Sequence, residues 1–90
     1  MAECRRFFIE GRVQGVFYRS NTEKKAKNLG LTGWVRNTED GGVECVACGI
    51  PEDLDVFEKW LWKGPLAAKV KSVKRTNIEF QDHHDFEILY

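Results

Sequence analysis

Two segments with helical character, each placed between segments with strand character, constrain the fold of this chain more than any other feature. Residues 5–13 alternate apolar and polar side chains, which predicts a half-buried strand. Ser20 and Glu23 frame a Ser-Asn-Thr-Glu run with the form of a capping box, so a helix is expected to begin with Ser20 as its N-cap. This helix should continue to about Asn28, because Leu-Gly follows and supplies a stop signal.

The second helical segment opens at Pro51, where proline and the two acidic residues after it suit the first turn of a helix. Apolar residues at 54, 57 and 61 give this segment one apolar stripe, and Gly-Pro at 64–65 ends it. Strand-like segments occupy residues 31–38, 43–48, part of 69–80, and 85–90, and a Glu-Asp-Gly-Gly turn at 39–42 predicts a hairpin between the first two.

The order strand, helix, strand, strand, helix, strand, followed by a short terminal strand, predicts an α+β fold. We expect a ferredoxin-like split β-α-β sandwich, with two helices on one face of a mostly antiparallel sheet of four or five strands. With 90 residues, 42% of them hydrophobic, the chain is expected to form a single domain over residues 1–90. In this topology the third strand runs antiparallel between the first two, so the turn after the first strand and the end of the second lie at one edge.

Charge and hydropathy exclude several classes of partner. Lys and Arg total 14 and so do Asp and Glu, and this zero formal net charge argues against a nucleic-acid partner, which usually meets a basic surface. No apolar run is long enough to span a membrane, and strand-like sequence begins without a signal segment. We therefore expect a cytoplasmic, monomeric protein that contacts neither membrane nor nucleic acid.

Residues 11–19 read Gly-Arg-Val-Gln-Gly-Val-Phe-Tyr-Arg and predict a glycine-flanked turn that ends in a positive charge where a helix begins. Such a turn can aim successive backbone N–H groups at an anion, and an arginine can donate two parallel hydrogen bonds to it. Asn37 ends the second predicted strand, at the same sheet edge, and its carboxamide can hold a water molecule. The expected anion-binding residues are Gln14, Gly15, Val16, Phe17, Tyr18 and Arg19.

These residue types favour one class of reaction. Neither motif offers an evident nucleophile, and no acidic cluster predicts a metal, so we expect neither metal nor cofactor. An acyl phosphate has a carboxylate leaving group with a pKa of about 4–5, so it needs no general acid. A positioned water and charge stabilisation are then sufficient, with Ser20 and Thr38 as further helpers. The sequence reveals no pocket selective for the acyl group.

The motifs also resemble those of a known family. Gly-x-Val-Gln-Gly-Val-x-Tyr-Arg at 11–19 is similar to the first signature of the acylphosphatases. Gly-Trp-Val-Arg-Asn at 33–37, with the glycines at 41 and 49 and the valine at 43, is similar to their second. The resemblance covers nearly the whole chain and departs only at Tyr18, where phenylalanine is more familiar. It implies that Arg19 binds the phosphate of a small acyl phosphate and that Asn37 orients the attacking water, without metal or covalent intermediate.

A non-catalytic module is the alternative, because folds of this topology also bind anions or RNA. RNA-binding sheets stack bases on exposed aromatic side chains. Here Phe8 is expected on the open face of the sheet, but Arg6, Glu10 and Glu44 surround it. RNA affinity that survives loss of Arg19 would favour this alternative.

Three cysteines remain, two of them with Cys-x-x-Cys spacing at Cys45 and Cys48. Three residues apart in a strand, these two side chains point to opposite faces, so a zinc or thiol-redox site is not expected. Cys45 should fill the core. Cys4 shares the outer face with Cys48 on a neighbouring strand, and we hypothesise a disulfide between them, which a reducing cytosol would oppose. The pair at 83–84, two adjacent histidines, is interpreted as a solvated turn.

Overall fold

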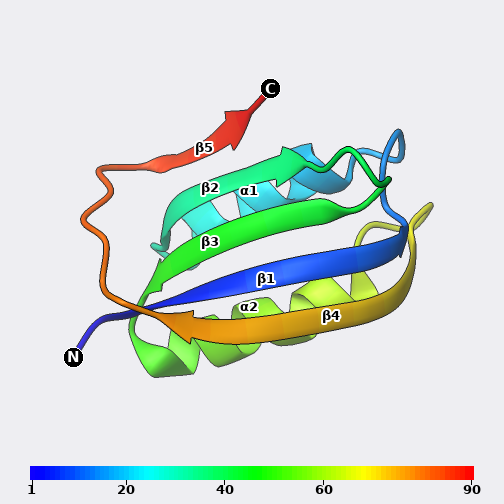
Figure 1. The fold of residues 1–90 in the computed structure, drawn as a ribbon. Coiled ribbons are helices and arrows are strands. Elements are labelled where there is room, and N and C mark those ends of the chain that lie inside the picture. Colours follow the sequence, from blue (N-terminus) through cyan, green and yellow to red (C-terminus); the bar gives the residue numbers. More distant parts are fainter.

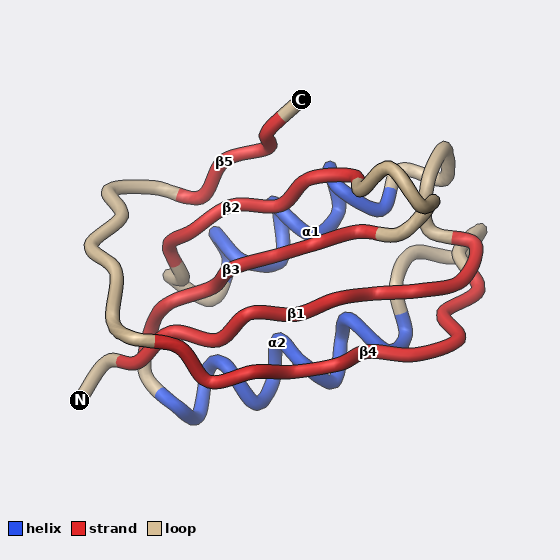
Figure 2. Tube along the Cα trace, in the orientation of Figure 1, coloured by secondary structure: helices blue, strands red, loops and turns tan.

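The computed structural model describes residues 1–90 and contains two helices and five strands (Figures 1 and 2). Their order along the chain is the predicted one, with the terminal strand included. The elements are β1 (Glu3–Arg12), α1 (Tyr18–Asn28), β2 (Thr32–Asn37), β3 (Val43–Gly49), α2 (Pro51–Lys63), β4 (Lys69–Ile78) and β5 (Phe86–Leu89).

The five strands form one sheet in the order β4-β1-β3-β2-β5. Every neighbouring pair is antiparallel except β2 and β5, which are parallel. Both helices lie on the same face of this sheet, α1 behind β2 and β3 and α2 behind β1 and β4 (Figure 1). The ferredoxin-like α+β fold is therefore confirmed, with five strands rather than four. Neither helix has the length and apolar character that crossing a membrane requires.

The core fills the space between the sheet and the helices. Phe7 and Ile9 of β1 point into it, as their alternation predicted, and meet the apolar stripe of α2 that includes Phe57 and Leu61. The rings of Phe7 and Phe57 make an edge-on contact with centroids 5.9 Å apart. Cys45 lies in the same core as a buried free thiol, and burial raises its pKa, so it acts as apolar filling.

The open face of the sheet carries a smaller buried cluster around Cys4, Val46 and Cys48. Cys4 and Cys48 are cross-strand partners of β1 and β3 with Cα atoms 4.1 Å apart, and the structure joins their sulfur atoms in a disulfide. Oxidation of this pair in solution stays a prediction.

The start of α1 differs from the predicted capping box. The helix begins at Tyr18, and the N-cap is Phe17, whose side chain makes no capping hydrogen bond. Ser20 therefore lies inside the first turn, where its hydroxyl donates to the carbonyl oxygen of Phe17 at 3.2 Å. Glu23 pairs instead with Lys27, one turn further on. The capping-box prediction was wrong because the loop before the helix turns more tightly than the sequence pattern implied.

Candidate active site

The loop between β1 and α1 contains two residues in the left-handed region, Gly15 with φ 73° and Phe17 with φ 62°. Glycine adopts this conformation without a steric cost, and Phe17 is the only non-glycine residue of the chain that has a positive φ. The tight loop brings the N-terminus of α1 directly after the end of β1. Because no side chain caps this helix and its first turn has no acidic residue, its first N–H groups remain free for an anion.

The side chains of Gln14 and Val16 hold the loop in place. The Gln14 amide donates to the carbonyl oxygens of Thr38 and Gly42, at 2.8 Å each, and so ties the loop to the turn between β2 and β3. Val16 packs into the hydrophobic core. Of these two predicted anion-binding residues, only the backbone is therefore available to a ligand.

Tyr18 anchors the loop to α2. Its ring is buried and packs against Trp60, and its hydroxyl donates to the carbonyl oxygen of Leu61 at 2.6 Å. In a continued helix that carbonyl would accept from residue 65, but Pro65 has no N–H group. Burial raises the pKa of the Tyr18 phenol, which stays a neutral donor. The tyrosine at the position where phenylalanine is more familiar thus supplies a hydrogen-bond donor for a carbonyl group in the last turn of α2.

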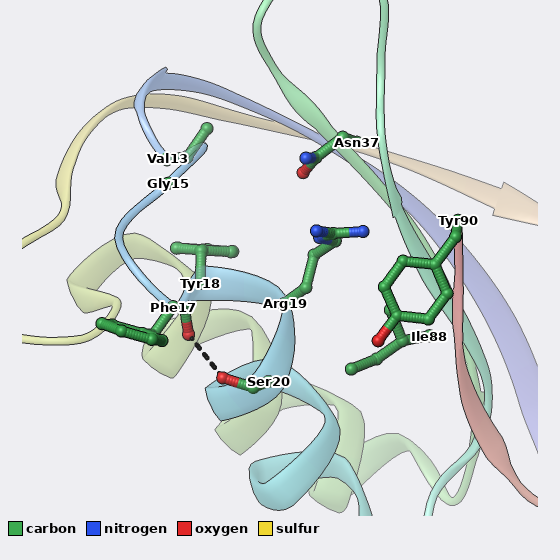
Figure 3. Close-up of a pocket in the computed structure, with 9 residues that line it drawn as sticks. All are labelled: Val13, Gly15, Phe17, Tyr18, Arg19, Ser20, Asn37, Ile88 and Tyr90. Carbon is green, nitrogen blue, oxygen red and sulfur yellow. Dashed lines mark hydrogen bonds between the residues drawn. The ribbon is translucent and has the colours of Figure 1, made fainter.

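Arg19 is the second residue of α1, and its side chain reaches into a pocket of about 300 Å³ beside the loop (Figure 3). Its guanidinium group forms no ion pair. The ring of Tyr90 lies 5.0 Å from its central carbon instead, within range of a cation–π interaction. The arginines paired with acidic side chains elsewhere are Arg5, Arg6, Arg36 and Arg75. The N–H donors of Arg19 are therefore free to bind an anion in the pocket.

Asn37 is the last residue of β2 and lines the same pocket. Figure 3 shows its side chain above the guanidinium group of Arg19. Its carboxamide oxygen is buried and has no hydrogen-bond partner. A buried acceptor of this kind costs free energy unless a donor reaches it, so it is suited to a bound water or ligand. The predicted meeting of Arg19 and Asn37 is present in the structure.

The pocket also contains residues that the sequence did not identify, namely Val13, Ile88 and Tyr90. The last two come from the end of β5, which pairs in parallel with β2 so that Leu89 lies opposite Arg36. The next residue, Tyr90, thereby reaches the side of Asn37. The pocket is lined by Val13, Gly15, Phe17, Tyr18, Arg19, Ser20, Asn37, Ile88 and Tyr90.

The other candidate helper, Thr38, does not line this pocket. Its hydroxyl donates to Asp40 and accepts from the N–H of Gly42 at 3.0 Å, which shapes the turn that follows Asn37. The hydrogen bond from Thr38, with a second from the Gly42 backbone, lowers the pKa of Asp40. Thr38 therefore supports the position of Asn37 from outside the pocket.

The open face of the sheet has the surroundings expected from the sequence. Phe8 is 39% exposed there, and beside it Glu44 is buried and paired with Arg6 and Arg36. The charged groups next to Phe8, the only exposed phenylalanine of the sheet, are therefore paired with one another. Binding of RNA on this face stays an alternative hypothesis.

Comparison with known proteins agrees with this geometry. The family model for acylphosphatases matches residues 5–88. An acylphosphatase of Legionella pneumophila (strain Corby) is 45% identical over 86 residues, which cover 96% of this chain and 94% of that protein. The structure of an acylphosphatase from Coxiella burnetii matches with a TM-score of 0.95 and 42% identity, over 98% of this chain and 93% of that one. The acylphosphatase from Bacillus subtilis matches with a TM-score of 0.95 and 35% identity over 100% of both chains. The chain therefore belongs to the acylphosphatase family of enzymes.

Proposed function

We propose that this enzyme hydrolyses the carboxyl–phosphate bond of small acyl phosphates, with the phosphate held by Arg19 and the loop of residues 14–19. One observation carries the proposal. The unpaired guanidinium group of Arg19 and the unpartnered carboxamide oxygen of Asn37 line a single pocket at the N-terminus of α1. The first is suited to a phosphate and the second to a water molecule.

The phosphate is bound by three sources of positive potential. Arg19 donates a pair of hydrogen bonds to two phosphate oxygens. The uncapped first turn of α1 adds N–H donors and the positive end of the helix dipole. By contrast, Glu52 and Asp53 occupy the first turn of α2, where they complement the dipole and leave no comparable anion site. This difference between the two helices favours the N-terminus of α1 as the phosphate-binding site.

Asn37 holds the nucleophile. A water that donates to its carboxamide oxygen has an oxygen lone pair free for attack on phosphorus. The water oxygen forms the new bond to phosphorus, while the electron pair of the breaking P–O bond remains on the departing carboxylate. One proton of the water passes to solvent. Because the carboxylate is a weak base, this step requires no side chain as a general acid, and catalysis comes from positioning and charge stabilisation.

The test is hydrolysis of benzoyl phosphate by the purified protein in the presence of EDTA. Wild-type protein should turn over the substrate, and Arg19→Ala and Asn37→Ala should each lower kcat/KM by about 10²–10⁴. Arg12→Ala and Asn77→Ala are matched controls, since both residues are exposed and lie outside the pocket. Near-wild-type turnover in either site variant would contradict the assignment. A folded wild-type protein without turnover would favour the non-catalytic, anion-binding alternative.

A further inference from the structure

Phe17 combines a costly backbone conformation with an exposed side chain. Its φ of 62° is one that bulky residues rarely adopt, and the residue is 77% exposed. The ring belongs to neither of the two core clusters. Packing within the protein therefore does not explain a phenylalanine at this position, where glycine would be free of strain.

The place of Phe17 in the pocket indicates what its ring can contact. In Figure 3, Asn37 lies directly above the guanidinium group of Arg19, whereas Phe17 and Ser20 lie below that group, with Phe17 on the side of the loop. In an in-line displacement, the leaving group departs from phosphorus on the side opposite the attacking water. Water held by Asn37 thus directs the acyl group toward the rim that carries Phe17.

We propose that the Phe17 ring is an acyl-group subsite that favours acyl phosphates with an aromatic or other flat apolar acyl group. The proposal rests on the hydrolysis proposed above. A ring that is exposed in the free enzyme loses water contact when a second ring stacks on it, and such pairs prefer offset or edge-on contacts. An acetyl group is too small to cover the ring and gains little from it.

The experiment measures a selectivity ratio, kcat/KM for benzoyl phosphate divided by kcat/KM for acetyl phosphate. Phe17→Leu keeps the apolar bulk and the backbone strain but removes the aromatic face. We expect this variant to lower the ratio by about two- to tenfold, the value of one aromatic contact. Phe80→Leu is the matched control, because Phe80 is also an exposed phenylalanine, 58% accessible, and lies outside the pocket. Its ratio should equal that of the wild type.

Phe17→Gly separates a role in binding from a role in stability. Glycine relieves the left-handed conformation, so the midpoint of thermal unfolding should rise while the selectivity ratio falls at least as far as in Phe17→Leu. A ring that served the fold would give the reverse, a lower midpoint and an unchanged ratio.

The outcomes distinguish the two proposals. An unchanged ratio in both Phe17 variants, with both substrates still hydrolysed, would overturn the subsite and leave the proposed hydrolysis intact. A wild-type protein that hydrolyses neither substrate would overturn both proposals together.

Discussion

Replacing Tyr18 by phenylalanine removes one hydroxyl group and tests how the loop between β1 and α1 is anchored. In the structure that hydroxyl donates to the carbonyl oxygen of Leu61 at 2.6 Å, and the tyrosine is only 1% exposed. Pro65 cannot supply the N–H group that would otherwise bond this carbonyl. Tyr18→Phe therefore leaves a buried acceptor without a donor, in a space that water reaches poorly.

The expected cost follows from that single lost hydrogen bond. An unsatisfied buried polar group costs about 1–3 kcal/mol, and the slightly more apolar phenylalanine ring offsets part of this. We expect the free energy of unfolding to fall by about 1–2 kcal/mol. For a domain of this size, each kcal/mol corresponds to a drop of about 4–8 °C in Tm.

Urea unfolding followed by circular dichroism measures the effect. The midpoint should fall by about 1 M, with the slope m unchanged, since the variant exposes the same surface on unfolding. Tyr90→Phe is the matched control for stability, because the Tyr90 side chain is fully exposed and its hydroxyl makes no hydrogen bond. A Tyr18→Phe midpoint equal to that of the wild type would refute the reasoning, because the Leu61 carbonyl would then need no donor from this side chain.

Three further perturbations have expected outcomes. Cys4 and Cys48 pair across 44 residues of sequence, so denatured, unreduced protein should contain one free thiol. A count of three free thiols would contradict the pairing. Reduction of the disulfide should lower the free energy of unfolding by about 2–4 kcal/mol. Hydrogen bonding from Thr38 lowers the pKa of Asp40, so the stabilisation is present above the usual aspartate pKa and is lost as pH falls through the lowered value. Stability of wild type and Asp40→Asn measured against pH should differ at neutral pH and converge in acid, and a constant difference would argue against this hydrogen bond. Gly33→Ala should lower the free energy of urea unfolding by about 3 kcal/mol or more. Gly33 has a φ of 137°, and an added Cβ atom would collide with the backbone carbonyl of Val46 in β3. A variant as stable as the wild type would show that the strand can shift to make room.

Local pattern was sufficient to predict the order of the elements and the position of Arg19 and Asn37 at one pocket. Alternation with a period of two predicts strands, and turn signals mark their ends, because these properties depend on neighbours in the chain. Once the strand order was inferred, Arg19 and Asn37 had to meet at one sheet edge. The outer-face position of Cys4 and Cys48 followed from the same alternation.

Tertiary structure alone decided the details that shape the pocket. Because Phe17 adopts the left-handed conformation, α1 begins at Tyr18, and Ser20 lies inside the helix instead of at its N-cap. The local sequence pattern did not predict this earlier start. Tyr90 reaches Arg19 only because β5 pairs with β2 in one particular register. Likewise, the hydroxyl of Tyr18 finds a carbonyl 43 residues away. Such contacts depend on how distant segments pack together, whereas strand alternation and turn chemistry are already present in a short stretch of chain.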